Sequence, residues 1–277
     1  MTRARFSRLL IPRKASDDAL LGILSLHGPL GFQIAGGDLV AFFRGSEAAR
    51  GASDALRSRH VRHELTTDIA ETDPLEAWRA TSRPFPVGRR FWIDPGDSGI
   101  PPPPSDRDRI ALFLPASQAF GTGGHESTRL ALLALEDEPL EDRTLLDVGT
   151  GSGILALAAA ALGARRSVGL DLDADAIFVA RENLARHAFG RKVRLYAGPV
   201  GACAGRFDIV VANMLAEEIL PEAGAILARA DRPGRILLSG LTRDSEPAVL
   251  DRFRAGKWIL AGRTTEKEWV CLSLTRG

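Results

Sequence analysis

One segment constrains the fold of this chain more than any other: the run from Leu146 to Gly153, which reads LDVGTGSG. The apolar residues at its start predict a buried strand, and the ILALAAAALG stretch behind it predicts a helix. Three glycines in this short turn allow the backbone to bend sharply and to approach a ligand without an intervening Cβ atom. A strand, a glycine-rich turn and a helix in this order are typical of an α/β unit that binds a nucleotide at the helix N-terminus.

The spacing of the glycines separates two kinds of cofactor. The dinucleotide fingerprint is GxGxxG, but its third position falls here on Ile154. The pattern is instead DxGxGxG, which is typical of class I S-adenosylmethionine-dependent methyltransferases. We therefore expect Asp147, Gly149, Gly151 and Gly153 to bind S-adenosyl-L-methionine, and an NAD-dependent dehydrogenase is disfavoured.

A second acidic residue indicates a nucleoside ligand. The segment 168–171 predicts a strand that ends in the carboxylate of Asp171. This carboxylate follows the glycine turn by about 20 residues, where a ribose-binding acid is expected. At the end of a second strand, its two oxygens can accept hydrogen bonds from both ribose hydroxyls. Asp173 follows at once and is interpreted as the N-cap of the next helix.

From residue 120 onward, predicted strands alternate with predicted helices. Strands are expected at 144–148, 167–171, 193–197, 208–212 and 235–239, and helices at 129–136, 154–162, 174–188 and 215–229, followed by a helix near 244–254 and strands at 257–261 and 268–274. This order predicts a doubly wound α/β fold with a mostly parallel sheet and helices on both faces. Upstream, Arg89–Ile93 and Arg109–Leu114 predict two strands that a proline-rich loop separates.

The chain is long enough for two unequal domains. Residues 1–70 mix short apolar runs with glycine and arginine and predict a small α+β domain. Asp73 and Pro74 begin a short helical stretch, so residues 71–84 are predicted to be a linker helix and hinge. Residues 85–277 then form the larger domain, which carries the glycine-rich turn.

Composition excludes several other classes of protein. The net charge is +1, so bulk electrostatics provide no argument for nucleic-acid binding. The two cysteines, Cys203 and Cys271, lack a CxxC partner, which indicates neither a disulfide framework nor a metal site and fits a reducing compartment. No signal peptide or membrane span is evident, so we expect a soluble, cytoplasmic protein.

Two further segments resemble a particular family. Residues 119–130 read AFGTGGHESTRL, and the fourth predicted strand ends in VANMLA at residues 211–216. Together with LDVGTGSG, these segments resemble the ribosomal protein L-eleven methyltransferase family (PrmA-type), whose members carry AFGTGxHxTT before the glycine turn and VANxxA after it. The stretch 78–92 and Glu268-Trp269 are also similar to the family. The resemblance covers about residues 73–277 and implies a seven-stranded, Rossmann-like class I methyltransferase fold.

The resemblance also implies which residues bind the cofactor. Thr128, Gly149, Asp171 and Asn213 occupy the family's cofactor-binding positions, and we expect the FGT segment to contribute through Phe120, Gly121 and Thr122. Other interpretations remain open: Phe120 is alternatively a core residue, Thr128 a helix cap, and His125 a structural residue that bonds to loop carbonyls. The sequence departs from the family at Gly124, and LYAGPVG after the third strand offers no acid for the adenine amine.

Asn213 is the candidate catalytic residue. It ends the fourth strand at the carboxyl edge of the sheet, where ligands bind in open α/β folds. Its side-chain oxygen and nearby carbonyls can accept hydrogen bonds from an incoming amine, in parallel with the (N/D)PPY loop of amino-group methyltransferases. The prolines and aromatic residue of that loop are missing here, which favours a flexible aliphatic amine over a planar base. No convincing general base is evident.

The resemblance implies transfer of methyl groups to lysine or N-terminal amines of a large-subunit ribosomal protein, ribosomal protein eleven. The first 70 residues would then recognise this protein partner, without direct binding to nucleic acid or membrane. Two alternatives remain: a class I methyltransferase for another protein lysine or a small amine, and a non-catalytic, cofactor-binding ribosome-assembly factor.

Overall fold

The computed structural model describes residues 5–12, 20, 23–24, 26–29, 31–35, 38–70, 83–95, 100–114 and 123–277. The chain forms two compact units, Met1–Ala77 and Trp78–Gly277. The predicted linker helix after Pro74 lies outside the described residues. No helix within the described ranges is long and apolar enough to span a bilayer.

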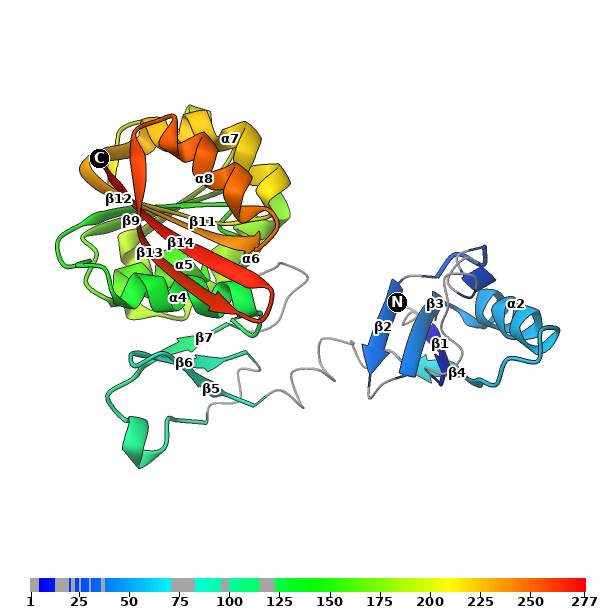
Figure 1. Ribbon diagram of the computed structural model, residues 1–277. Helices are drawn as coiled ribbons and strands as arrows, with labels where there is room; N and C mark the ends of the chain where they lie inside the picture. The colour runs from blue at the N-terminus through cyan, green and yellow to red at the C-terminus, as the bar shows by residue number, and fades with distance from the viewer. Residues whose placement is uncertain are drawn as a thin grey trace. The chain divides into compact units, whose positions relative to one another are not determined.

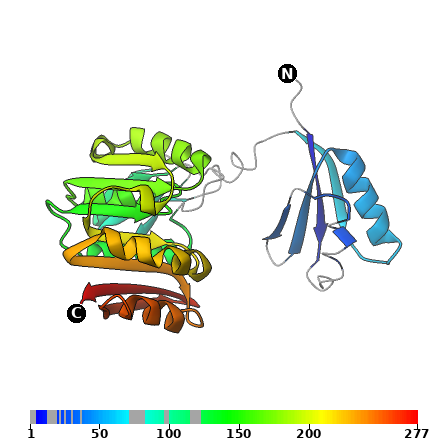
Figure 2. The ribbon, with the colours of Figure 1, turned by 90° about the horizontal axis from the view of Figure 1, so that it is seen from above.

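The smaller unit is an α+β domain, as its mixed sequence predicts. Its strands are β1 (Arg5–Ile11), β2 (Gly31–Ala35), β3 (Asp38–Arg44) and β4 (Glu64–Ala70), which form an antiparallel sheet in the order β2-β3-β1-β4. The helix α2 (Ser46–Arg57) lies along one face of this sheet (Figure 2). Alternate residues of β3, namely Leu39, Ala41 and Phe43, pack with Leu56 of α2 in one core, because side chains two apart in a strand share a face.

A small sheet of three described strands begins the larger unit. It consists of β5 (Phe85–Val87), β6 (Phe91–Asp94) and β7 (Ile110–Phe113), in the order β5-β6-β7. The predicted strand start at Arg89 is wrong, because residues 88–90 form a turn in which Gly88 has a φ of +56°. Both oxygens of Glu136 accept backbone N–H groups of this turn, from Arg89 at 2.9 Å and Arg90 at 2.8 Å. The strand β5 was not predicted.

The main sheet confirms the predicted α/β alternation. Its strands are β8 (Thr144–Val148), β9 (Arg166–Asp171), β10 (Val193–Ala197), β11 (Phe207–Asn213), β12 (Ala230–Thr242), β13 (Trp258–Glu266) and β14 (Trp269–Arg276). These seven described strands lie in the order β10-β9-β8-β11-β12-β14-β13. The first five are parallel to one another, whereas β14 is antiparallel to both β12 and β13.

Helices cover both faces of the main sheet. They are α4 (Glu126–Glu136), α5 (Ile154–Ala161), α6 (Ala174–Ala185), α7 (Ala216–Arg229) and α8 (Glu246–Arg254). Figure 1 shows α7 and α8 on one face and α4 and α5 on the other. Neighbouring residues of one strand therefore enter different cores: Leu145 packs with α4 and α5, and Leu146 packs with α7 and α8. This two-sided burial explains why the strands are continuously apolar.

The helix predicted at 174–188 ends earlier, at Ala185. A short 3₁₀ helix, Ala188–Lys192, follows it. Between them, His187 is buried and joins this region to β7: its Nε2 accepts the Phe113 N–H at 3.0 Å, and its Nδ1 lies 3.0 Å from the Asn183 carbonyl oxygen. Burial lowers the pKa of His187, which favours the neutral ring that this pair of bonds requires.

Candidate active site

A cavity of about 520 Å³ lies at the carboxyl end of the parallel strands. Five of the predicted site residues line it: Thr128, Gly149, Gly151, Asp171 and Asn213. They come from α4, from the turn after β8 and from the ends of β9 and β11, which are far apart in the sequence. The order of the sheet brings them together, because β8 is paired with both β9 and β11. The edge of a parallel sheet where the chain reverses its strand order is the expected position of a ligand.

The glycine-rich turn has a backbone that requires glycine. Gly149, Gly151 and Gly153 have φ angles of +68°, +51° and +82°, which side chains rarely permit. A Cβ atom on Gly149 would lie 2.7 Å from Sδ of Met214. The turn therefore brings bare backbone to the cavity wall, and its conformation and its packing both exclude a larger residue.

Asp171 stabilises the same turn. Its Oδ2 accepts the backbone N–H of Gly151 at 2.9 Å, and its Oδ1 accepts that of Asp173 at 3.0 Å. Since a carboxylate oxygen can accept more than one hydrogen bond, each oxygen keeps a lone pair for a second donor. The carboxylate is thus oriented by the backbone and faces the cavity with acceptor capacity to spare.

Asp147 and Gly153 do not line the cavity. Asp147 is fully buried, and its Oδ2 accepts the Thr150 hydroxyl at 2.6 Å and the Ala156 N–H at 3.1 Å. Burial raises the pKa of Asp147 to about 7, although both of these hydrogen bonds oppose the shift. Gly153 is the N-cap of α5. The structure places both residues behind the cavity wall, where they hold the turn and the first residues of α5 in shape.

Asn213 and Thr128 form a bonded pair in the cavity. The Asn213 Nδ2 donates to Oγ1 of Thr128 at 3.2 Å. The Asn213 Oδ1 is buried and has no hydrogen-bond partner among the described residues. A buried acceptor that lacks a partner is costly, and such an atom at a cavity wall is suited to a donor on a ligand.

His125 has a structural role, but it caps a helix instead of bonding to loop carbonyls. The helix α4 begins at Glu126, and His125 is its N-cap, with Nδ1 accepting the Ser127 N–H at 3.3 Å. The idea that Thr128 caps a helix at 129–136 is therefore wrong. The His125 ring also contacts Trp269 edge-on at a centroid distance of 4.7 Å, and both rings line the cavity.

Sequence reasoning missed several cavity residues. They are Leu172, Pro199, Val200, Met214, Leu215, Glu218, Glu222 and Trp269. The first five follow directly on the ends of β9, β10 and β11, so the rule that ligands bind at carboxyl ends was a usable signal. Trp269 and the two glutamates have no such local signal, because packing alone brings them there. Phe120, Gly121 and Thr122 lie outside the described residues.

The cavity has a strongly negative lining. Among the described residues that line it, Asp171, Asp173, Glu218 and Glu222 supply four carboxylates, and none is a lysine or an arginine. The rest of the described lining is largely apolar. A lining of this kind favours a cationic ligand with apolar parts.

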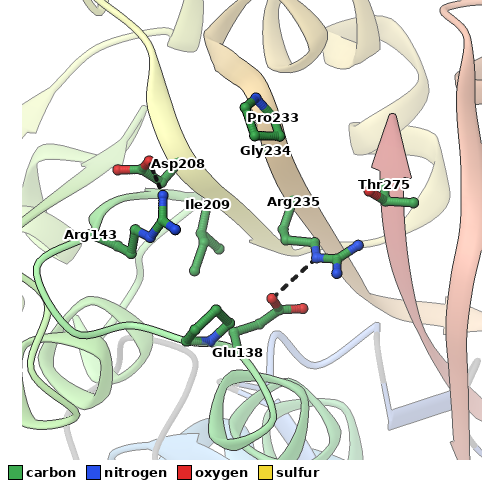
Figure 3. Close-up of a pocket in the computed structure, with 9 residues that line it drawn as sticks. Glu138, Arg143, Asp208, Ile209, Pro233, Gly234, Arg235 and Thr275 are labelled. Atoms are coloured by element: carbon green, nitrogen blue, oxygen red, sulfur yellow. Dashed lines mark hydrogen bonds and ion pairs between the residues drawn. The ribbon is translucent and has the colours of Figure 1, made fainter. Parts of the chain in front are cut away.

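A second hollow, of about 210 Å³, lies at the opposite, amino end of the strands (Figure 3). Its charged groups are already paired: Arg235 Nε lies 3.4 Å from Oε2 of Glu138, and Arg143 Nη1 donates to Asp208 Oδ1 at 3.1 Å. Asp208 also accepts the backbone N–H of Thr144 at 2.9 Å. These contacts tie the starts of neighbouring strands together, so this hollow is structural.

The fold and the first cavity together define a class of enzyme. Numbered from β8 along the chain, the strand order is 3-2-1-4-5-7-6. The seventh strand, β14, lies between the fifth and the sixth and is antiparallel to both. This order, the DxGxGxG turn and the acid at the end of the second strand identify a class I S-adenosylmethionine-dependent methyltransferase. The residues present fit this cofactor: the turn offers bare backbone, Asp171 has free lone pairs, and the lining is acidic.

Comparison with known proteins identifies the family. The family model "Ribosomal protein L11 methyltransferase (PrmA)" matches residues 35–277, and the chain belongs to this family. It is 42% identical over 206 residues to the ribosomal protein L11 methyltransferase of Geobacter sulfurreducens, covering 74% of this chain and 67% of that protein. It is 41% identical over 211 residues to that of Geobacter metallireducens, covering 76% and 69%.

A solved structure supports the same conclusion. The crystal structure of the ribosomal protein L11 methylase from Lactobacillus delbrueckii subsp. bulgaricus superposes with a TM-score of 0.65 and 27% sequence identity. The match covers 70% of this chain and 99% of that chain. The predicted class, fold and cofactor are thereby confirmed.

Proposed function

We propose that this enzyme transfers methyl groups from S-adenosyl-L-methionine to lysine or N-terminal amines of ribosomal protein L11. The name of its family and of its relatives supports the substrate. The observation that carries the chemistry is the buried Oδ1 of Asn213, which has no hydrogen-bond partner in the described part of the chain and belongs to a residue of the same cavity as the glycine-rich turn. An acceptor in this position suits the N–H group of an incoming amine.

The residues of the cavity suggest how each part of the cofactor would be held. The turn at Gly149 and Gly151 would face the methionine moiety, and Asp171 would accept the ribose hydroxyls. The adenine contacts, which the sequence left unassigned, would come from the apolar side chains of Leu172 and Val200, which line the same wall. When bound, the cofactor supplies a methyl group on a cationic sulfur.

The protein's part in the reaction is to orient an uncharged amine. A free lysine has a pKa of about 10.4, so its amine must lose a proton before it can attack. Desolvation in the cavity and the positive charge of the bound cofactor would both lower the pKa of the amine, against the opposing effect of the four carboxylates that line the cavity. Asn213 would then hold the amine by one N–H, with its lone pair directed at the methyl carbon. Orientation of this kind can lower a barrier by roughly 7–11 kcal/mol in favourable cases.

The shape and charge of the cavity favour an aliphatic amine. Met214 and Leu215 follow Asn213, where enzymes that methylate planar bases carry prolines and an aromatic residue. Flexible apolar side chains suit the methylene groups of a lysine. Glu218 and Glu222 would attract its ammonium group during entry.

The remaining parts of the proposal concern the setting of the reaction. We propose that the smaller unit recognises the protein substrate, and that the enzyme acts in the cytoplasm without direct contact with nucleic acid or membrane. The described part of the cavity lining contains no lysine or arginine, which supports a substrate other than nucleic acid. A methyltransferase for another protein lysine or for a small amine is the second candidate, since the same cavity would accept both.

Replacement of Asn213 by alanine tests the proposed chemistry. We expect kcat for methylation of purified L11 to fall by about 10²-fold, the size of effect that removal of one orienting polar group produces. The dissociation constant of the cofactor, measured by calorimetry, should rise by less than about tenfold, because one neutral hydrogen bond is lost. Mass spectrometry of the substrate would report the methyl groups.

A control and an opposing result complete this test. Circular dichroism should show that the variant is folded like the parent enzyme. Unchanged kcat would refute the role of Asn213. The proposed substrate would be refuted if the parent enzyme bound the cofactor normally and methylated another protein but not L11.

A further inference from the structure

The hydrogen bond between Asn213 and Thr128 joins two distant parts of the chain. Asn213 ends β11, and Thr128 lies in the first turn of α4. Thr128 is only 1% exposed, and its Oγ1 lies 3.2 Å from Nδ2 of Asn213. The bond therefore ties the end of β11 to the start of α4 beside the cavity.

An amide side chain can present either its oxygen or its nitrogen to a cavity, since half a turn about its last torsion exchanges them. The two orientations have opposite chemistry. The nitrogen would direct N–H groups at the N–H groups of an amine and at a cationic sulfur, whereas the oxygen would accept from the amine. In the structure the Thr128 hydroxyl accepts a hydrogen bond from Nδ2, which engages the nitrogen and leaves Oδ1 of this cavity-lining residue without a partner among the described residues.

The backbone next to Thr128 is held in place. The Ser127 N–H is bonded to Nδ1 of His125, and the Ser127 carbonyl accepts the hydroxyl of Ser239 at 2.7 Å. Ser239 belongs to β12, the strand next to β11, and its carbonyl accepts the Met214 N–H at 3.1 Å. The backbone segments that carry Asn213 and Thr128 are therefore both hydrogen-bonded to Ser239 at the same edge of the sheet.

We propose that Thr128 is a positioning residue, which locks the Asn213 amide so that its oxygen faces the methyl-accepting amine. This inference rests on the proposed role of Asn213 and adds to it the residue that sets its orientation. It is compatible with a contact between Thr128 and the cofactor. The hydroxyl accepts from Asn213 with its oxygen and retains its proton for a second partner.

Three substitutions at Thr128 test the proposal. Thr128→Val keeps the shape and removes the hydroxyl, Thr128→Ala serves if the valine variant folds poorly, and Thr128→Ser keeps the hydroxyl. For the valine or alanine variant we expect kcat to fall about tenfold, as for one lost hydrogen bond, with KM for both substrates changed by less than about threefold. The serine variant should recover at least about half of the parent kcat.

A double variant separates positioning from cofactor binding. If Thr128 acts only through Asn213, Asn213→Ala combined with Thr128→Val should have the kcat of Asn213→Ala alone, because the second change then removes nothing further. Independent roles would make the two losses multiply, which would overturn the proposal. A raised dissociation constant for the cofactor with unchanged kcat would also overturn it.

Thr144 provides a matched control. Its buried hydroxyl donates to Oδ2 of Asp208 at 2.8 Å, at the opposite end of the sheet. Thr144→Val should lower the unfolding midpoint and leave kcat unchanged, which shows that loss of a buried threonine hydroxyl is not sufficient. If Asn213→Ala loses activity but Thr128→Val keeps it, this inference alone fails. If Asn213→Ala is fully active, the proposed function of Asn213 fails as well.

Discussion

Two aspartates of this site form hydrogen bonds with the backbone of the glycine-rich turn and of the helix that follows it. Asp147 and Asp171 each bind backbone N–H groups around the glycine-rich turn, one from behind and one from the cavity side. Asp147 is fully buried, and burial raises its pKa to about 7, so a share of the protein carries it protonated at neutral pH. Its Oδ1 has no hydrogen-bond partner within the described part of the chain. The charge of Asp147 is therefore a cost to the folded state.

This cost predicts a dependence of stability on pH. The pKa of Asp147 is higher in the folded protein than the 3.8 of an unperturbed aspartate, so the folded state binds more protons between about pH 4 and 7. Asp147 is expected to lower the free energy of unfolding as pH rises through this window, and to have a constant effect above it. Asp147→Asn keeps an oxygen for Thr150 and Ala156 and cannot ionise.

Urea unfolding from pH 4 to 8 would measure the difference. The stability of Asp147→Asn relative to the parent should increase by a few kcal/mol from pH 4 to 7, on the order of the shift in pKa. A difference that stays constant across these pH values would show that Asp147 titrates normally.

At the scale of elements, the hairpin of β13 and β14 supports the mouth of the cavity. Its tip carries Glu266 and Lys267, which pair with Arg129 and Glu126 of α4. The hydrogen bond from Lys267 is the main cause that lowers the pKa of Glu126 to about 2. These contacts hold the start of β14, and with it Trp269, against His125.

Lys267→Met should detach the tip of this hairpin from α4. Since the pKa of Glu126 is depressed, the ion pair contributes stability above about pH 4.5, and this contribution disappears as pH falls toward 2. We expect a small loss of stability at pH 7, because Lys267 is largely exposed and its ion pair is screened by solvent, and a smaller loss at pH 3. Chemical denaturation at both pH values would measure it.

Lys257→Met is the control for this substitution. Lys257 has a φ of +65° and Lys267 one of +54°, so both lysines occupy left-handed turn positions. No ion pair of Lys257 is found with any described residue, and its replacement should change stability equally at both pH values. A pH-independent effect of Lys267→Met would contradict the prediction.

At the scale of the whole molecule, the two units have separate hydrophobic cores. The core of Met1–Ala77 contains Leu9, Phe43 and Leu56, and the two cores of Trp78–Gly277 are built from residues of that unit alone. A unit with its own core can fold independently of its neighbour. All the described residues that line the cofactor cavity belong to the larger unit.

Deletion of Met1–Ala77 should therefore separate recognition from chemistry. We expect the remaining chain to bind S-adenosyl-L-methionine like the full chain, as measured by calorimetry. Methylation of L11 should fall by at least about a hundredfold, the loss expected when a docking module is removed. Methylation of a short lysine peptide at high concentration should be unchanged. Equal loss for both substrates would assign the smaller unit a role in catalysis instead.

The sequence alone determined the class of fold and the main features of the site. Apolar runs of strand and helix length predicted β8 to β12 and their helices, because two-sided burial imposes a local pattern on each strand. The DxGxGxG turn and Asp171 predicted the cofactor, since glycine adopts positive φ angles without strain and permits the close approach seen there. Errors in the larger unit included the boundary at Arg89, where a turn shares the composition of a strand, and the short strand β5, which was not predicted.

Only the tertiary structure decided which residues from distant parts of the sequence are in contact. It placed Asp147 behind the cavity, made His125 the cap of α4, and brought Trp269 to the cavity wall. It also joined Asn213 to Thr128 across the sheet edge. Such contacts link residues far apart in the sequence, and no periodicity or local motif encodes them. They arise because the sheet sets β11 beside β8 and β12 and packs α4 over their ends.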